Sequence, residues 1–425
     1  MQRVWQRLTR QFIALYVFLL IGWTASPAAA AENAPWPQFL GPHRNGISSE
    51  TGLLDRFPED GLKELWRVAG GVGMSGLAIA DGRLLTLVQR SGKQFVVAHN
   101  ARTGKPIWQT AIAPAYKNQM ADGPRGTPAI AGDQVFAFSG EGVLAALNAS
   151  DGTPVWSHNV VKELRGRVAD YGMAGSPLVA GDVVIVTAGA PRASVVAYDR
   201  KTGELAWQAG NDPAGYSSPA LLDGAGQPQL VAYTDNSLLG INPQSGAVLW
   251  RYPYVTNFEC NIATPLSIKG RVFLSSGENH GSVLLNVKRA GDRFATEEVW
   301  SSQGPRSVLR NEWQTSILLG DYLYGWDNVG GAGPITHLTC IKAATGERVW
   351  QERRFGKGNM IAAEGKLLMT TFAGEFVLAR ATPDSYEELG RAKVLESTRQ
   401  APALANGLLY LRDNNDILCL DVRKH

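Results

Sequence analysis

Short apolar segments separated by tight turns recur along this sequence of 425 residues. In the segment VVIVTA at 183–188 almost every residue is apolar, whereas a strand with one exposed face would alternate apolar and polar residues. Gly181-Asp182 precedes it and suits a turn, because glycine accepts a positive φ and aspartate bonds to nearby backbone. The pattern predicts strands buried on both faces, and in this unit we expect them at Ser176–Ala180, Val183–Ala188, Val195–Tyr198 and Leu205–Gln208.

A tryptophan recurs at a fixed place in these units. It stands at positions 66, 108, 156, 207, 250, 300 and 350, at intervals of 42, 48, 51, 43, 50 and 50 residues. In five units a glycine lies four residues before it, in Thr103-Gly104, Asp151-Gly152, Thr202-Gly203, Ser245-Gly246 and Thr345-Gly346. Such a period indicates a repeat architecture. We expect the tryptophan to be structural, because a large ring at one place in every outer strand packs between neighbouring repeats.

Units of four short, doubly buried strands are typical of β-propeller blades, in which each sheet is stacked between two others. We expect the first seven blades at about 76–110, 127–159, 176–209, 217–251, 263–301, 314–352 and 358–396. Blade five carries a longer hairpin at Lys288–Thr296, blade six a glycine-rich insert at Gly330–Gly333, and blade seven has YEELGRAKVLE in place of the tryptophan.

The end of the chain supplies only three strands for an eighth blade, at Ala401–Leu404, Leu408–Arg412 and Ile417–Asp421. Residues 63–68, KELWRV, lie before the first blade and would provide the fourth. The prediction is therefore an all-β fold, an eight-bladed β-propeller of four-stranded antiparallel blades closed by an N-terminal strand. A seven-bladed ring is the alternative, and it requires one set of strands to be discarded.

The first residues have the features of a cleaved signal peptide. Arg3, Arg7 and Arg10 precede an apolar run of twelve residues, and Ala28–Ala31 offers a small-residue cleavage site. Twelve residues are too few for a helix that crosses a bilayer core of about 30 Å. We expect a signal peptide at 1–31, an N-terminal extension at 32–62 and the propeller at 63–425, in a periplasmic or secreted protein without a transmembrane anchor after cleavage.

Charge and cysteine content exclude some classes of function. Residues 1–31 hold three of the 41 basic residues and none of the 38 acidic ones, so the mature chain is neutral. A neutral protein gives no support for nucleic-acid binding. The three cysteines, Cys260, Cys340 and Cys419, are too few and too scattered to form a disulfide framework.

The unit Ala197–Trp207, AYDRKTGELAW, matches A-x-D-x-x-T-G-x-x-x-W, and Ala98–Trp108 matches it with Asn in place of Asp. The sequence thereby resembles the PQQ-like β-propeller repeat over about 63–422. That resemblance covers quinone-dependent alcohol and glucose dehydrogenases and the BamB-type outer-membrane assembly factor. WPQFLGPHRNG at 36–46 and GPRGTP at 123–128 look like a third group, exported BamB-like propellers with no settled activity.

We expect the assembly-factor type of role, a non-catalytic binding or scaffold protein in the cell envelope. In the dehydrogenases the resemblance implies a vicinal disulfide, a Ca²⁺ ion held by carboxylate and amide groups, and a catalytic Asp. This sequence has no Cys-Cys pair and no evident oxygen-rich Ca²⁺ cluster, so we expect no catalytic residue, no metal site and no cofactor. PQQ with calcium belongs to the alternative, a PQQ-dependent alcohol dehydrogenase-like oxidoreductase. A second alternative is a carbohydrate- or polymer-binding accessory protein.

The loops that lead into the innermost strands should open together on one face of the ring. Arginine, tyrosine, tryptophan and asparagine there are typical of a binding surface, for an anionic ligand or for a strand or loop of a partner protein. The candidate residues are Met74, Arg125, Tyr171, Tyr216, Asn257, Asn261, Arg310, Asn311, Trp313 and Arg399. We expect the partner to be a cell-envelope protein or peptide segment, and the protein itself to be a monomer.

The signal-peptide interpretation predicts a mature N-terminus at Ala31 or Glu32. Mass spectrometry of the protein recovered from the cell envelope measures this directly. A chain that still carries Met1–Ala30 would contradict it.

Overall fold

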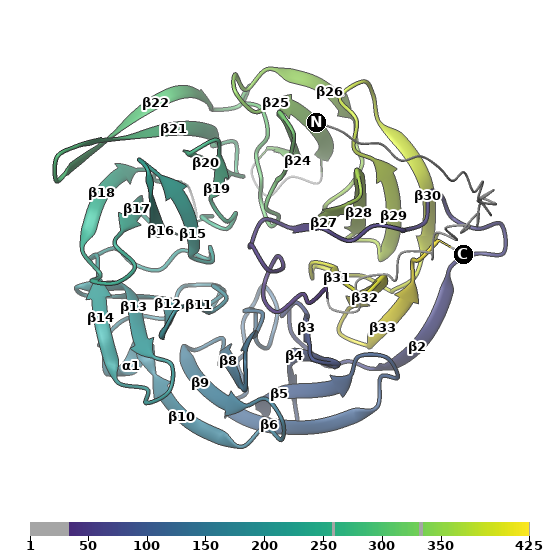
Figure 1. Ribbon diagram of the computed structural model, residues 1–425, viewed down its shortest axis with the longest axis horizontal. Coiled ribbons are helices and arrows are strands. Elements are labelled where there is room, and N and C mark those ends of the chain that lie inside the picture. Colours follow the sequence, from purple (N-terminus) through teal and green to yellow (C-terminus); the bar gives the residue numbers. More distant parts are fainter. Residues whose placement is uncertain (1–33, 257–259, 331–334, 425) are drawn as a thin grey trace, which may run out of the picture.

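The computed structural model describes residues 34–256, 260–330 and 335–424, and these form eight sheets around a central channel (Figure 1). Seven sheets are four-stranded antiparallel meanders, and the eighth has a fifth strand. The predicted eight-bladed, all-β propeller is confirmed, and within these ranges the one helix is α1 (Val160–Glu163). The predicted signal peptide lies outside the described residues, as does the glycine-rich insert after Gly330.

The strands of each blade follow one another outward from the channel. Blade one consists of β3 (Ala78–Ala80), β4 (Arg83–Arg90), β5 (Lys93–Asn100) and β6 (Pro106–Pro114), and blade two of β7 (Ala129–Ala131), β8 (Gln134–Phe138), β9 (Val143–Asn148) and β10 (Pro154–Asn159). Blade three consists of β11 (Leu178–Ala180), β12 (Val183–Ala190), β13 (Ala193–Asp199) and β14 (Leu205–Ala209). Blade four consists of β15 (Ala220–Gly224), β16 (Gln227–Tyr233), β17 (Ser237–Ile241) and β18 (Val248–Pro253).

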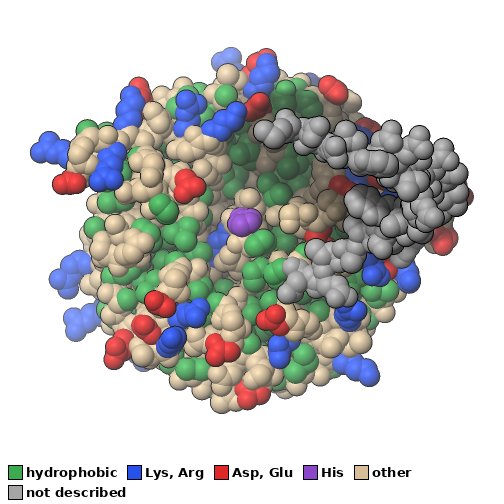
Figure 2. Space-filling view, in the orientation of Figure 1, with side chains coloured by type: hydrophobic (Ala, Val, Ile, Leu, Met, Phe, Trp, Pro, Cys, Tyr) green, Lys and Arg blue, Asp and Glu red, His purple; other side chains and the backbone are tan. Residues whose placement is uncertain are grey.

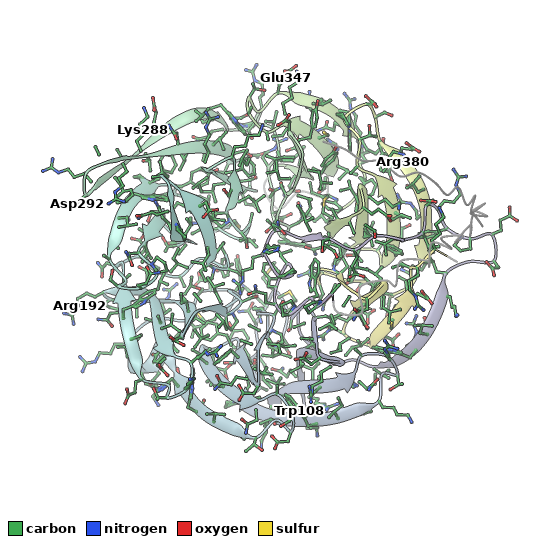
Figure 3. The ribbon with its side chains drawn as sticks, viewed as in Figure 1. Trp108, Arg192, Lys288, Asp292, Glu347 and Arg380 are labelled. Atoms are coloured by element: carbon green, nitrogen blue, oxygen red, sulfur yellow. The ribbon has the colours of Figure 1, made fainter. Side chains whose placement is uncertain are left out.

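Blades five to seven continue the pattern. Blade five consists of β19 (Leu266–Ile268), β20 (Arg271–Ser276), β21 (Gly281–Ala290) and β22 (Arg293–Gln303). Blade six consists of β23 (Ile317–Leu319), β24 (Tyr322–Val329), β25 (Ile335–Lys342) and β26 (Arg348–Glu352). Blade seven consists of β27 (Gly358–Ala363), β28 (Lys366–Thr371), β29 (Glu375–Arg380) and β30 (Glu387–Lys393). The hairpin of β21 and β22 extends beyond the ring at the upper left of Figure 1, as the sequence predicted. Lys288 and Asp292 lie on this hairpin in Figure 3.

Blade eight joins the two ends of the chain. β31 (Ala403–Ala405), β32 (Leu408–Arg412) and β33 (Asp416–Asp421) come from the C-terminal end, and β2 (Lys63–Ala69) adds the outer strand by antiparallel pairing with β33. The buried Arg412 guanidinium reinforces this junction, because it donates to Thr86 Oγ1 at 2.6 Å and to the Leu87 carbonyl at 2.8 Å in blade one. Closure by an N-terminal strand is therefore confirmed.

The repeated tryptophan connects each blade to the next. Trp207 is 8% exposed, and its indole N–H donates to the Pro243 carbonyl of blade four at 3.1 Å. A Cβ on Gly246, in the turn of blade four, would lie 2.9 Å from the Trp207 ring, so this position requires glycine. Carbonyls of the following blade also accept from Trp66, Trp108, Trp156, Trp300 and Trp350. Six of the seven repeated tryptophans thus bond to the following blade, as expected of inter-blade packing residues.

The aspartate or asparagine before the turn explains the rest of the motif. Asp199 Oδ1 accepts from the backbone N–H groups of Lys201 at 2.9 Å and Thr202 at 2.8 Å. These bonds hold the turn so that Gly203, at φ +76°, faces the Trp156 ring. The motif is thus a turn that presents a glycine to the tryptophan of the preceding blade.

Blade seven has lost its tryptophan, and the N-terminal extension supplies a ring there. Gly390 pairs with Leu378 directly before a bulge, as Trp350 pairs with Cys340 in blade six. Phe57 lies over Gly390, where a Cβ would approach the phenyl ring to 2.2 Å. The extension therefore packs against the blade that lacks the usual side chain.

The extension also crosses the ring, as the purple segment in Figure 1 shows. β1 (Ile47–Ser48) pairs with β27 as the fifth strand of blade seven, and Trp36 exchanges backbone hydrogen bonds with Ile79 of β3. Between them the buried Arg44 guanidinium donates to the carbonyls of Pro219 at 2.6 Å and Ser176 at 3.2 Å, and burial lowers its pKa to about 9. In Figure 2 side chains fill the centre of this face, with most charged groups nearer the rim.

We predict that Trp207→Ala lowers the free energy of unfolding by about 3–5 kcal/mol, because a buried ring between two blades leaves a cavity. Leu205→Ala is the matched control: Leu205 lies on the same strand, is 48% exposed, and should change stability by about 0.5 kcal/mol or less. Urea unfolding measures both. Equal losses in the two variants would contradict the packing role of the tryptophan.

Candidate functional site

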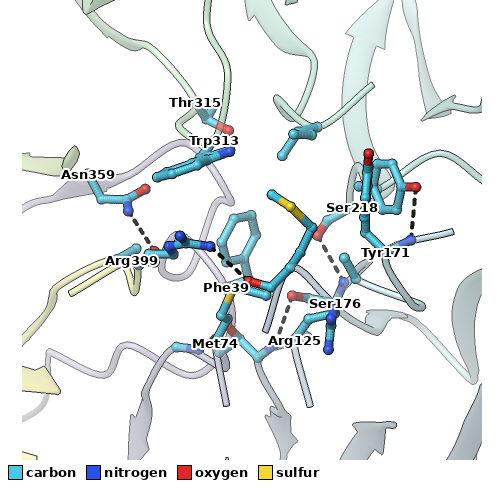
Figure 4. A pocket seen from close by; sticks show the side chains of 17 residues that line it. Phe39, Met74, Arg125, Tyr171, Ser176, Ser218, Trp313, Thr315, Asn359 and Arg399 are labelled. Carbon is cyan, nitrogen blue, oxygen red and sulfur yellow. Dashed lines mark hydrogen bonds between the residues drawn. The ribbon is translucent and has the colours of Figure 1, made fainter. Parts of the chain in front are cut away.

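The channel contains a cavity of about 180 Å³ lined by residues from every blade (Figure 4). Each blade contributes residues at or directly before the start of its innermost strand. In most blades there are two such residues, with one residue between them in the sequence. These residues are Met74 and Gly76, Arg125 and Thr127, Ala174 and Ser176, Tyr216 and Ser218, Ile262, Trp313 and Thr315, Asn359, and Arg399 and Ala401. Phe39, Met120 and Tyr171 complete the wall.

The inner positions of these pairs form hydrogen bonds from blade to blade. The backbone N–H of Gly76 donates to Thr127 Oγ1 at 3.1 Å, and that of Thr127 donates to Ser176 Oγ at 2.9 Å. Ser176 N–H continues the series to Ser218 Oγ at 2.9 Å. Blades five and six are joined in the same way, by Thr264 and Thr315. The small hydroxyl residues therefore join the innermost strands to one another, while both positions of most pairs line the cavity.

Trp313 and Arg399 form one side of the cavity. The Arg399 guanidinium carbon lies 4.6 Å from the Trp313 ring and 5.1 Å from the Phe372 ring. Lys357 Nζ also lies 4.5 Å from the Trp313 ring, and it forms an ion pair with Glu312 at 2.6 Å. Burial lowers the pKa of Arg399, and burial raises the pKa of Glu312. This wall is thus an aromatic ring flanked by two cations.

Arg125 and two tyrosines form the other side. Arg125 is 7% exposed, donates to the Ala121 carbonyl at 2.7 Å, and lies 4.8 Å from the Tyr116 ring. Burial lowers its pKa. The rings of Tyr171 and Tyr216 lie 5.6 Å apart, and the Tyr171 backbone N–H donates to the Tyr216 hydroxyl at 3.2 Å.

Of the ten candidates, the structure brings six to the cavity: Met74, Arg125, Tyr171, Tyr216, Trp313 and Arg399. Three others, Asn261, Arg310 and Asn311, do not line it, which corrects the expectation that they face the channel mouth. Asn257 lies outside the described residues.

The three corrected residues are held inside the protein. Asn261 accepts from the Tyr233 hydroxyl at 2.9 Å and is fully buried. Asn311 Nδ2 donates to the Trp326 carbonyl at 3.0 Å. Arg310 forms a buried double hydrogen bond with Asp327, at 2.6 and 2.9 Å. Each side chain satisfies loop or core groups instead of facing the channel.

Eleven other residues that line the cavity were not among the sequence candidates, and they include Ile262, Asn359, Phe39 and Met120. Ile262 stands at the same position before its innermost strand as Arg125, Tyr216 and Trp313, so strict use of that spacing would have included it, whereas Asn359 stands at the position of Thr315. Phe39 and Met120 carry no such signal. Phe39 comes from the extension, and in Figure 4 it lies in the middle of the view among the labelled side chains.

The residues present do not fit a quinone with a calcium ion. No Asp or Glu lines the cavity, and the described part of the chain has no group of three His, Cys, Asp or Glu residues that could hold a metal ion. Cys260, Cys340 and Cys419 are buried, and no disulfide joins them to one another. The glycine-rich GVGMSG at 71–76 leads into strand β3, so it lacks the helix that a dinucleotide site requires.

Comparison with known proteins gives a family and a set of related folds. A family model described as outer membrane protein assembly factor BamB matches residues 52–159 and 92–352. No curated protein sequence matches the chain. Among solved structures, the quinohemoprotein alcohol dehydrogenase from Comamonas testosteroni is similar at a TM-score of 0.65 and 15% identity, over 93% of this chain and 81% of that one.

Two further structures show the same fold. BamB from Moraxella catarrhalis gives a TM-score of 0.58 and 15% identity, over 86% of this chain and 98% of that one. A europium-containing methanol dehydrogenase gives 0.60 and 14%, over 87% of each chain. At these identities the likeness shows the propeller alone.

We predict that the two kinds of arginine respond differently to loss of charge. Arg310→Met should lower the free energy of unfolding by about 3–5 kcal/mol, because it leaves Asp327 buried without its partner. Arg399→Met should cost about 1 kcal/mol or less, since it removes a partly exposed cation from an aromatic ring. Urea unfolding gives both values, and the opposite order would contradict the assignment of Arg310 to the core and Arg399 to the cavity.

Proposed function

Because the chain belongs to the family described as outer membrane protein assembly factor BamB, we propose that it is a non-catalytic binding protein of the cell envelope. It is exported, acts as a monomer, and binds a segment of an envelope protein at the channel cavity. Within the described ranges, no helix has the length and apolar character needed to cross a membrane.

The composition of the cavity wall is the observation that carries this proposal. Trp313, Tyr171 and two arginines surround an opening to which all eight blades contribute. Aromatic residues and arginine are enriched at binding hot spots, where they combine a large contact area with directed hydrogen bonds. The lining contains no carboxylate, histidine or cysteine that could serve as a base, nucleophile or metal ligand. The wall therefore suits recognition better than catalysis.

A PQQ-dependent dehydrogenase is the second candidate, and its support is the likeness to quinohemoprotein alcohol dehydrogenase and methanol dehydrogenase folds. The missing carboxylate and metal ligands weigh against it. Addition of PQQ with Ca²⁺ separates the two candidates. Saturable absorbance changes together with alcohol-dependent dye reduction would contradict the non-catalytic proposal.

Site-specific photo-crosslinking in cells tests the binding proposal. Met120 lines the cavity and is 42% exposed, so a crosslinker at this position should give a discrete adduct with an envelope protein. Val248, on the outer strand β18 and 46% exposed, is the matched control position and should not give it. Addition of Trp313→Ala should weaken partner binding by about 2 kcal/mol or more and remove the adduct.

Two outcomes would contradict the proposal. One is the same set of adducts from positions 120 and 248. The other is an adduct from position 120 that persists unchanged in the Trp313→Ala background.

A further inference from the structure

The charges of the cavity wall are unbalanced. Arg125 and Arg399 both line the cavity, and the hydrogen bonds of their guanidinium groups within the described residues go to backbone carbonyls instead of to the nearby carboxylates of Asp122 and Glu312. Arg310 nearby is neutralised by Asp327, and Lys357 by Glu312. Buried or half-buried cations without a hydrogen bond to a carboxylate are costly, so an anion in the cavity would be favourable.

Both arginines also have hydrogen-bonding capacity left over. Arg125 Nε is buried and has no acceptor. The Arg399 guanidinium makes one long hydrogen bond in the described structure, 3.4 Å to the Met120 carbonyl, and otherwise lies against aromatic rings. A buried N–H without a partner leaves a desolvation cost that a ligand oxygen can remove. The charge of the two arginines and their remaining N–H donors both favour an anionic group with oxygen acceptors.

Much of the remaining wall is apolar, beside small hydroxyl residues, two tyrosines and Asn359, and the cavity volume limits the size of the ligand. Phe39, Met74, Met120, Ile262 and Trp313 contribute hydrocarbon, sulfur or ring surface. The volume of about 180 Å³ is slightly larger than an engineered protein cavity of about 150 Å³ that binds benzene. It is smaller than the roughly 300–1,000 Å³ of drug-sized pockets. One ring-sized group and a small anionic group therefore match the space.

We propose that this cavity binds an organic monocarboxylate that carries one ring-sized apolar group, with the carboxylate held by Arg125 and Arg399 and the apolar group packed against Phe39 and Trp313. This rests on the proposed binding function of the same site and specifies its ligand class. Arginine suits the carboxylate because its planar fork offers two parallel N–H donors. No metal ion takes part. The ligand is either a free acid or the C-terminal residue of a polypeptide.

Titration calorimetry with phenylacetate as the probe tests the proposal. We expect saturable binding that EDTA leaves unchanged. Phenylacetamide, which has the same shape without the charge, should bind at least about tenfold more weakly, and so should acetate, which lacks the ring. Binding of phenylacetamide as strong as that of phenylacetate, or no binding of phenylacetate, would overturn the proposal.

Variants connect the binding to this wall. Arg399→Met should weaken phenylacetate binding at least about tenfold, and Trp313→Ala should do the same through loss of ring contact. Arg380→Met is the matched control, because Arg380 lies on the rim (Figure 3) in an exposed pair with Glu387, and its loss should leave binding unchanged. Unchanged binding in folded Arg399→Met and Trp313→Ala proteins would overturn the proposal even if Arg125 variants fail to fold.

A second series distinguishes the two sources of the carboxylate. A tripeptide that ends in phenylalanine with a free C-terminus is compared with its amidated form and with phenylacetate. Tighter binding of the free tripeptide than of phenylacetate identifies a chain terminus as the ligand, whereas tighter binding of phenylacetate identifies a free acid. Equal binding of the free and amidated tripeptides would count against carboxylate recognition.

Failure of the carboxylate proposal can be distinguished from failure of the proposed binding function by comparing phenylacetate binding with the crosslinking test. Crosslinking at position 120 without any phenylacetate binding would leave the binding function standing and remove the carboxylate ligand. Phenylacetate binding without a crosslinked partner would support the carboxylate ligand and contradict binding of an envelope protein.

Discussion

Pairing between β2 and β33 is the interaction on which the rest of the structure depends. The chain is a series of blades that cannot bury both faces alone, and an open series would leave two sheets exposed at its ends. By supplying the outer strand of blade eight, residues 63–69 close the series into a ring. Arg412 then joins blade eight to blade one through hydrogen bonds to Thr86 and Leu87. Closure also creates the cavity, because residues from all eight blades line it.

Within the ring, one contact is repeated with local replacements. At five interfaces a tryptophan on the outer strand packs against a glycine in the turn of the next blade, and the other interfaces have different contacts. Trp250 donates to Gln229 within its own blade at 2.5 Å, and Phe57 of the extension covers Gly390 in blade seven. The extension therefore has two structural roles. It packs Phe57 against blade seven, which lacks a tryptophan, and it places Phe39 in the cavity wall.

Much of this could be predicted from the sequence because the repeat ties each residue to a place in a blade. The number of blades, the closing strand and the inter-blade role of the tryptophans all follow from spacing. The cavity was predicted only in part. Spacing places Trp313 and Asn311 in the same loop, but side-chain direction is set by hydrogen bonds that spacing does not reveal, such as that from Asn311 to the Trp326 carbonyl. Phe39 and Arg44 escape prediction because a non-repeating segment carries them into the channel.

Two arginines, Arg125 and Arg399, line the channel cavity among aromatic and apolar side chains. A crystal structure of the full mature chain soaked with phenylacetate is the most direct measurement of their proposed role in binding a carboxylate. The ring is expected between Phe39 and Trp313, with the carboxylate within hydrogen-bond distance of both Arg125 and Arg399. Phenylacetate absent from the channel, or bound with its carboxylate away from either guanidinium group, would contradict this.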